Sequence, residues 1–524
     1  MVRESTHVPP VVPVAVSAAC AFYAFTALSS LLTLERRLAA VIDFGVAVTA
    51  AGIAASLYIS LRSRPETGCR TIRFIYAGIL LAFTAWSVHA TTAGRYASLL
   101  PRDQWRTVYC TARGEPRNWG EKFRVLTCDV REVTDAAGAV FSASGTMEAV
   151  LPAELVRSGL PGGIADGRGT RSYIADGFPL VLSGETRKDR NGRSAFYADA
   201  IVARQTVPTD SDQGVGIPMR LRSALRLRLI RLLYELGASG GFLLALLSGS
   251  REYLEPDTAE AFRSTGLSHI LALSGMHLSL LGGVALGAGT KIGGRKLGIR
   301  LALPAMLFFV WFAGSSPSLL RALLMSLLSH GCLLLGIPVK AGALLAGAVI
   351  LHMMIAPADM VSIAFMLSTG ALLGIIVIGE SLTAIVKPSI PVSLASPIAA
   401  SIGAQCMTAP LVSLVFGCLA PCGILASVFV SPFASFFLVS GLAVVTISLL
   451  VPAFAHAAGA LIEIQYACIL RIIDFFRAFP PLSLSSAAGK MTAGFMPLLI
   501  GLCFVYLSFR SSKRRSSLEY FTGL

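Results

Sequence analysis

The chain has 524 residues, of which 54% are hydrophobic and 14% are charged, and its mean hydropathy is +0.71. Soluble domains carry about 25% charged residues, so this composition excludes a soluble globular enzyme. The 44 basic and 29 acidic side chains give a formal net charge of +15. In a membrane protein such an excess first reflects basic cytoplasmic loops, so the charge alone does not indicate nucleic-acid binding.

Apolar stretches of about 17 to 25 residues, long enough to cross the hydrocarbon core, recur along the chain. The first three predicted spans cover residues 11–34, 39–60 and 72–92, and together they form an N-terminal region, 1–94. A short basic loop between the second and third spans is predicted to be cytoplasmic. It contains Arg62, Arg64, Arg70 and Arg73. The first run lacks a basic n-region and a clear cleavage site, so it is predicted to be a retained helix.

Residues 95–215 are predicted to form an extracytoplasmic domain after the third span. Gly, Pro and charged residues become more frequent there, and about five short runs alternate between apolar and polar residues, which is typical of strands. Five short strands fit a small all-β barrel of OB-like type. The segment has 16 basic and 15 acidic residues, so it is not a strongly cationic nucleic-acid surface.

Two features of this domain are candidate sites, and both remain open at the level of the sequence. Four cations lie around a predicted Asn-Gly turn and near two aromatic residues, where they either contact DNA or lipid phosphates or form a solvated turn. They are Arg187, Lys188, Arg190 and Arg193. Cys110 and Cys128 flank the first predicted hairpin, where a disulfide or two free thiols are both compatible with the spacing.

Residues 216–265 are predicted to form a basic amphipathic helix and a connector. Leu221, Leu225 and Leu229 recur at helical spacing, and the arginines lie largely on other faces. Such a helix is typical of a membrane surface, and it is also suited to guiding a polyanion towards a pore. Arg222 and Arg226 are therefore predicted contacts for lipid or DNA phosphates.

Residues 266–509 form the second block of predicted spans. Its spans are 266–288, 301–314, 318–336, 341–356, 360–379, 394–416, 423–450 and 493–509. The basic loop 291–300 and the basic tail 510–524 are predicted to be cytoplasmic. Residues 452–478 fit either a polar span or an interfacial helix, and Pro432 is another candidate break. The predicted fold is an α-helical polytopic membrane protein of 11 or 12 spans with the OB-like domain inserted after the third span.

Polar side chains cluster at the start of this block. Ser268, His269, Ser274 and His277 lie in apolar surroundings, where such groups are costly unless they face an interior cavity or one another. Ser274 and His277 are three residues apart and are predicted to share one helix face, while Gly266 and Gly275 allow a close approach or a break.

Arg321 is predicted to lie within a span, where it needs a partner. A passing phosphate, a helix-end carbonyl or Asp359 would each serve. For Arg321 and for the two histidines the alternative is a purely structural role, namely snorkelling or hydrogen bonding between helices.

Several of these segments resemble one protein family. The runs Ala245–Gly249 and Phe262–His277 closely resemble the ComEC-type DNA internalisation proteins of bacterial transformation, whose membrane core has an S-H-L-L-A-I-S-G-L-H-like segment. Ser316–Met325 resembles the S-P-S-x-x-R-A-x-x-M element of that family, and Phe365–Ser368 resembles F-Q-L-S. Spans marked by Pro410 and Pro432 follow in the same order. The N-terminal helices and the outer OB-like insertion also match the layout of the family, so the resemblance covers nearly the whole chain. Met366 and Ser427 stand where the family usually has Gln and Asn.

The resemblance implies a channel that passes one DNA strand across the bacterial cytoplasmic membrane. Its candidate lining residues are Ser268, His269, Ser274, Gly275, His277 and Arg321. The implied partners are single-stranded DNA, membrane lipids, a separate extracytoplasmic DNA receptor, a separate nuclease and a cytoplasmic motor, and a homo-oligomer is also compatible. Many members continue into a metallo-β-lactamase-like domain. None of the seven histidines of this chain forms its H-x-H-x-D-H cluster, so no nuclease activity, catalytic residue, metal or cofactor is expected.

Two other functions are compatible with the sequence. An exporter of small molecules or envelope precursors would have a similar composition, but the inverted halves of many carriers are missing. An intramembrane serine protease would use Ser274 as nucleophile and His277 as base, which must meet within about 3 Å. Replacing Ser274 by Ala separates a protease from a channel.

Overall fold

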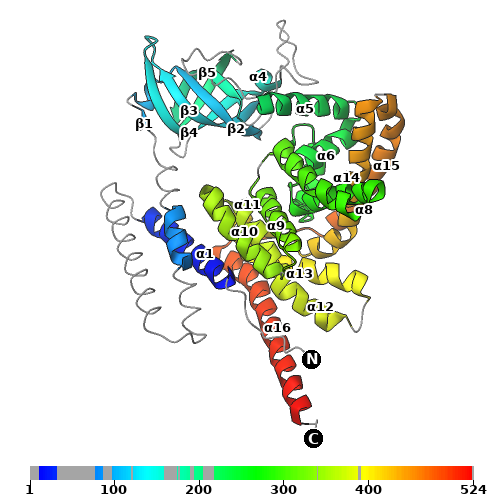
Figure 1. The fold of residues 1–524 in the computed structure, drawn as a ribbon. Coiled ribbons are helices and arrows are strands. Elements are labelled where there is room, and N and C mark those ends of the chain that lie inside the picture. Colours follow the sequence, from blue (N-terminus) through cyan, green and yellow to red (C-terminus); the bar gives the residue numbers. More distant parts are fainter. Residues whose placement is uncertain are drawn as a thin grey trace.

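The chain forms a β-barrel followed by a helical region (Figure 1). The computed structural model describes residues 11–31, 77–86, 97–98, 100–119, 122–157, 174, 177–188, 194–203, 217–314, 316–338, 340–387, 391–451 and 453–521. The predicted span 39–60 and the basic loop with Arg62 to Arg73 lie outside these residues. The predicted first span contains α1 (Val11–Leu31), and the third contains a helix at Ala77–Trp86.

Five strands close into a barrel. They are β2 (Thr107–Trp119), β3 (Phe123–Thr134), β4 (Val140–Pro152), β5 (Pro179–Lys188) and β6 (Ser194–Ala203). The order is β4-β3-β2-β5-β6, and a parallel pairing of β4 with β6 closes the sheet. A two-residue strand, β1 (Ala97–Ser98), pairs with the middle of β4, and α4 (Ala153–Arg157) follows β4. The predicted all-β barrel of five strands is confirmed. Its OB-like insertion after a third span stays a prediction.

The helical region begins at Ile217. Its elements are α5 (Ile217–Tyr234), α6 (Gly237–Ser248), α7 (Pro256–Ser264), α8 (Gly275–Ala313), α9 (Pro317–Leu334), α10 (Ala341–Ile355), α11 (Ile363–Gly374), α12 (Glu380–Val386), α13 (Val392–Phe416), α14 (Gly423–Leu450), α15 (Ala453–Arg477) and α16 (Ala487–Phe521). Among the described residues, six helices are long and apolar enough to cross a membrane, namely α8, α9, Ile363–Val386, α13, α14 and Ala487–Leu507. A total of 11 or 12 spans stays a prediction, because residues 32–76 are not described.

α8 is a helical hairpin. Its backbone leaves the helical conformation at Gly293 and Gly294. Leu278 and Phe309 share one apolar cluster, although 31 residues of straight helix would separate them by about 46 Å. Two predicted spans, 266–288 and 301–314, therefore correspond to the two halves of α8, and the basic loop 291–300 forms the hairpin tip.

The predicted start of this span at residue 266 is wrong. Gly266 has a left-handed φ of +76°, and a Cβ on it would lie 2.9 Å from the Cβ of Ala420. The chain therefore makes a turn between α7 and α8, and the helix begins only at Gly275. Only glycine adopts this backbone conformation readily, which ends the helical register of α7.

Pro432 does not break its helix, because α14 runs from Gly423 to Leu450. α15 packs along α14 and buries Ile462, Tyr466 and Ile469. β7 (Cys418–Leu419), just before α14, pairs with β8 (Leu482–Ser483), just after α15. α14 therefore leads away from this hairpin and α15 returns to it. Among the described helices, α15 is not one of those long and apolar enough to cross a membrane, so a crossing by residues 452–478 stays a prediction.

α6 lies at the centre of the largest apolar cluster. Ten consecutive residues, Ser239–Ser248, are buried, so α6 is covered on every side. The ring of Phe242 contacts the rings of Phe262, Phe437 and Tyr466, which come from α7, α14 and α15. A helix that is apolar all round is stable only in such a central position.

Candidate nucleic-acid path

Five helices of the membrane region form a closed ring. α8 contacts α9, α9 contacts α11, α11 contacts α13, α13 contacts α14, and α14 contacts α8. Among the described residues, α8 makes no extensive contact with α11 or α13, and α9 makes none with α13 or α14. We call α8, α9, α11, α13 and α14 the helix ring.

A buried arginine joins two helices of this ring. Arg321 on α9 is 7% exposed, and its Nη2 donates a hydrogen bond to Ser368 Oγ on α11 at 2.8 Å. Ser318 Oγ lies 2.7 Å from the same hydroxyl oxygen. The Nε of Arg321 is buried and has no hydrogen-bond partner among the described residues. This cluster of Arg321, Ser318 and Ser368 is called the arginine cluster below.

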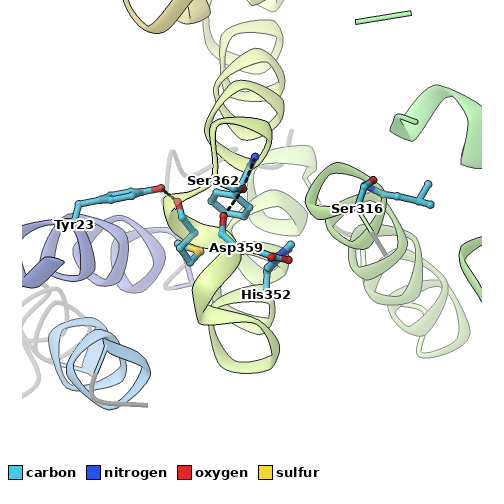
Figure 2. A network of polar contacts seen from close by, with 8 residues as sticks. Tyr23, Ser316, His352, Asp359 and Ser362 are labelled. Carbon is cyan, nitrogen blue, oxygen red and sulfur yellow. Dashed lines mark hydrogen bonds and ion pairs between the residues drawn. The ribbon is translucent and has the colours of Figure 1, made fainter. Parts of the chain in front are cut away.

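The partner suggested for Arg321 is different in the structure. The Asp359 carboxylate lies 3.1 Å from His352 Nε2, and no ion pair with Arg321 occurs among the described residues (Figure 2). Among the described residues its hydrogen-bond partner is a neutral hydroxyl, so none of them supplies a negative charge to the guanidinium. Ser318 and Ser368 were not chosen from the sequence as site residues. Both lie in segments that resemble family motifs. This resemblance is the sequence signal that could have identified the two hydroxyls as site groups.

Ser274 and His277 form a helix cap. Ser274 is the N-cap residue of α8, and the Nδ1 of His277 accepts a hydrogen bond from the Ser274 backbone N–H at 3.3 Å and lies 3.1 Å from Ser274 Oγ. Ser274 therefore precedes the helix, so the prediction that it lies within a span is wrong, although its side chain does meet that of His277. The reciprocal contact satisfies backbone N–H groups that the first helical turn leaves unpaired.

His277 points into an apolar pocket. The residue is 1% exposed, and its Nε2 has no partner among the described residues. The pocket is lined by Leu247, Leu280, Leu281, Val284, Phe309, Leu438, Val439 and Leu442. This position lies between α6, α8 and α14 and not beside the arginine cluster.

The remaining predicted lining residues lie outside the first turn of α8 or at a helix contact. Ser268 and His269 are exposed in the turn between α7 and α8, where His269 Nδ1 lies 3.2 Å from the Gly266 carbonyl oxygen. A Cβ on Gly275 would lie 3.3 Å from the Cβ of Ala322 on α9. Gly275 therefore allows α8 to approach α9 closely at Ala322, the residue next to Arg321. None of the described contacts joins either histidine to Arg321.

Hydroxyl groups also lie at two other contacts of the ring. Ser401 Oγ on α13 lies 2.8 Å from Ser427 Oγ on α14. Ser435 Oγ on α14 lies 3.7 Å from the sulfur of Met276 on α8. Polar side chains therefore occur where α9 meets α11, where α13 meets α14 and where α14 meets α8.

The two arginines predicted on the surface of α5 are buried. Arg226 is 2% exposed and donates from Nη2 to the Ser248 carbonyl at 2.7 Å, while Arg222 is 6% exposed and donates from Nε to the Phe312 carbonyl at 3.2 Å. The predicted phosphate contacts are therefore wrong for this structure, and Leu221 is exposed instead. The physical reason is that α6 and α8 end here with unpaired carbonyl groups, which attract cationic donors.

The barrel candidates are only partly described. Arg187 lies over the ring of Tyr197, 5.4 Å from its centroid, which is a cation–π contact. Arg190 and Arg193 lie outside the described residues, and so does the side chain of Lys188.

Cys110 and Cys128 are buried free thiols, so the structure gives no disulfide between them. Cys110 is paired with Val130 and Cys128 with Ala112, which sets the two thiols diagonally on neighbouring strands. Their mutual hydrogen bond and then burial raise the pKa of Cys128 above that of an ordinary thiol.

An ion pair attaches the barrel to the helical region. Arg124 on β3 is 2% exposed, and its Nη2 and Nε donate to the two carboxylate oxygens of Glu252 at 2.8 and 3.2 Å. Glu252 lies between α6 and α7.

In the part of the chain that the structure describes, no group of three or more His, Cys, Asp or Glu side chains is arranged to hold a metal ion.

Comparison with known proteins identifies the family. Residues 246–511, which include the helix ring and the arginine cluster, match the family model described as competence protein. The chain therefore belongs to the competence protein family. This competence protein is 35% identical over 89 residues to the ComE operon protein 3 of Bacillus subtilis strain 168. That match covers 17% of this chain and 12% of the relative. No solved structure matches this chain.

Family membership confirms the resemblance to ComEC-type proteins. The matched region is the membrane part of that family and contains the helices of crossing length. This competence protein therefore fits a multi-pass protein of the bacterial inner membrane.

Proposed function

We propose that this competence protein passes a single DNA strand across the cytoplasmic membrane through the helix ring. The observation that carries the proposal is Arg321, a buried guanidinium inside the matched region whose close partners are neutral hydroxyls. A phosphate group supplies the charge and the acceptor geometry that this guanidinium lacks.

A polyanion cannot cross hydrocarbon, so the route must be polar or cationic. The ring supports such a route because hydroxyl groups occur at three of its helix contacts. In an ideal ring of five helices of about 10 Å diameter with axes 8 to 10 Å apart, the central opening is about 5 Å wide. That opening is too narrow for duplex DNA, so we expect one strand to pass, after a modest widening of the ring.

The proposed orientation places the barrel outside and the C-terminus in the cytoplasm. The barrel and the end of α16 lie at opposite ends of the molecule (Figure 1). The pairing of β7 with β8 is compatible with an outward crossing by α14 and a return crossing by α15. In this orientation we assign the basic residues of the connecting loops to the cytoplasmic side, as the positive-inside rule expects. They are Lys291, Arg295, Lys296, Arg300, Lys340 and Lys387.

The proposed channel needs other components. A strand must be delivered to the barrel side, its complement must be degraded, and work must be done to move it. We therefore assign a separate extracytoplasmic DNA receptor, a separate nuclease and a cytoplasmic motor to this pathway, and membrane lipids to the outer surface of the helices. The extracytoplasmic domain, residues 95–215, provides the surface nearest to an incoming strand.

One contact favours a second candidate, an intramembrane serine protease. Ser274 Oγ lies 3.1 Å from His277 Nδ1, which is within reach for a nucleophile and its base. A base of this kind also needs a group that orients it, and the other ring nitrogen of His277 has no partner among the described residues. The capping role explains the contact without catalysis, so the channel remains the preferred function.

The channel is tested by uptake of fluorescent duplex DNA into a DNase-resistant cytoplasmic state. Cells would contain the intact gene, a deletion, and the deletion restored with Arg321→Gln or with Arg300→Gln as the matched control. We expect Arg321→Gln to lower uptake about 10- to 100-fold, since a hydrogen bond to a charged group contributes 1.5 to 3 kcal/mol. Arg300 is exposed on α8, so the control should retain uptake. Unchanged uptake in the deletion strain, or equal uptake by both variants at normal protein levels, would reject the channel.

A further inference from the structure

α10 is too short to cross the membrane. It has 15 residues and therefore rises about 22 Å, whereas the hydrocarbon core is about 30 Å thick. Its first turn follows Lys340, a cation that favours the membrane surface. The connection from α10 to α11, which contains the short helix η2 (Pro357–Val361), therefore lies about 8 Å below the opposite surface.

Two ionisable side chains lie at this break. His352 at the end of α10 is fully buried, and its Nε2 is 3.1 Å from Asp359 Oδ2 on η2 (Figure 2). The other ring nitrogen of His352 has no partner among the described residues. The ring of Phe365 on α11 meets the imidazole edge-on, with centroids 4.9 Å apart.

The backbone of the break is satisfied by its neighbours. Tyr23 of α1 donates its hydroxyl hydrogen to the Met360 carbonyl at 2.7 Å. Ser362 Oγ donates to the Asp359 carbonyl at 2.6 Å and accepts from the Phe365 N–H at 3.2 Å (Figure 2). Non-helical backbone at membrane depth persists only where it is held in this way or lines a water-filled cavity.

The Asp359 side chain itself is 28% exposed. A carboxylate facing lipid at this depth is costly, so its open side must face water. The other ionisable groups on the elements packed against the break are few. They are Cys20 and Tyr23 on α1, and Arg321, His330 and Cys332 on α9, while α11 has none. Arg321 bonds Ser368, one turn after Phe365, and His330 Nδ1 lies 2.8 Å from the Ser326 carbonyl.

We infer that His352 and Asp359 form a proton-binding site at the break between α10 and α11, reached by water from the barrel side. Protonation of His352 converts a neutral imidazole beside a carboxylate into an ion pair with no net charge. One negative charge is thereby removed close to the arginine cluster, where phosphates are expected to pass. The inference rests on the proposed channel for this consequence, but the proton site itself does not depend on DNA.

The site is tested on the full-length protein in lipid nanodiscs by nuclear magnetic resonance of nitrogen-labelled histidine between pH 5 and 8. The signal lost in His352→Gln identifies His352, and His330→Gln is the matched control. We expect the His352 signal to change with pH and Asp359→Asn to alter that response, because the protonated ring then lacks its carboxylate partner. A signal that does not change with pH, or the same response in Asp359→Asn, would overturn the inference.

Uptake measurements separate this inference from the channel. DNA uptake by His352→Gln cells should become independent of external pH between 5 and 8, whereas His330→Gln cells should keep the dependence of the wild type. A pH profile of His352→Gln that matches the wild type would overturn the link to transport even if His352 titrates. Failure of the channel proposal would show instead in Arg321→Gln, which leaves the titration of His352 in place.

Discussion

Buried arginines occur both where the barrel meets the helical region and in the helix ring, but the arginines of the two regions have different partners. At the junction, Arg124 bonds both oxygens of a carboxylate, and Arg226 bonds a helix-end carbonyl and lies over the ring of Phe312. In the ring, Arg321 bonds a neutral hydroxyl and one of its nitrogens has no partner among the described residues. All three side chains are at most 7% exposed, so burial alone does not distinguish them.

This difference separates structural arginines from a candidate ligand-binding arginine. A buried cation with full partners contributes to the fold, and its loss leaves a partner unsatisfied. A buried cation with incomplete partners costs stability, and such a cost persists where a ligand compensates for it.

Glu252→Ala should have the largest effect on stability. It leaves Arg124 buried without its carboxylate, which costs about 3 kcal/mol of unfolding free energy. Thermal unfolding of the purified protein in detergent measures the loss. Glu260→Ala is the control, because Glu260 is exposed and lies 3.9 Å from Arg263. Equal melting temperatures for the two variants would show that the junction does not depend on this ion pair.

Arg226→Met should lower the unfolding free energy by about 1 to 3 kcal/mol. The substitution keeps an apolar stem but leaves the Ser248 carbonyl without its donor. The same unfolding assay applies, with Arg228→Met, an exposed arginine on α5, as the control. If Arg226→Met is as stable as the control, the assignment of Arg226 as a structural residue is wrong.

Ser274→Ala should cost about 1 kcal/mol through loss of the N-cap of α8. DNA uptake should remain, because the cap has no catalytic part in a channel. Uptake and protein level are measured together in restored deletion cells. Complete loss of function with a normal protein level and melting temperature would instead support the protease.

Arg321→Met should change the melting temperature by less than Arg226→Met, although it abolishes the proposed phosphate contact. Replacing an incompletely paired buried charge by an apolar side chain of similar size is often neutral or stabilising. The two variants are compared in one unfolding experiment. A larger loss in Arg321→Met would place Arg321 among the structural arginines.

The smallest expected effect concerns the chemical reactivity of the two buried thiols of the barrel, Cys110 and Cys128. Because the pKa of Cys128 is raised, its reactive thiolate is scarcer at pH 7 than that of an ordinary cysteine, and raising the pH towards 9 should restore little reactivity. Mass spectrometry after alkylation should find Cys110 and Cys128 unmodified in the folded protein and modified after unfolding. Recovery of a disulfide-linked peptide pair would contradict the free thiols.

Much of the fold was predictable because it depends on local patterns. Alternating residues from Thr107 to Ala203 predicted the five strands, and the basic run between two apolar segments predicted the tip of the α8 hairpin. The errors concern positions that depend on distant contacts. Ser274 looked like part of a span because its neighbours are apolar, yet it caps α8 after a turn that Gly266 makes against Ala420.

The candidate site was only partly predictable for the same reason. Arg321 was identified from its charge within an apolar segment, whereas Ser368, 47 residues later, became relevant only when α9 and α11 came together. Arg222 and Arg226 were misassigned because a helical pattern shows which residues share a face. It does not show whether carbonyl groups from other helices lie opposite.

The amino-acid sequence was sufficient to predict the membrane class, the barrel and the resemblance to the ComEC-type competence proteins, because apolar length, strand alternation and motif order are local properties of the chain. The three-dimensional structure was needed to show which arginines are paired, that α8 folds back on itself and that His352 meets Asp359. These depend on contacts between segments far apart in the sequence, where the low dielectric of the interior makes each partner decisive.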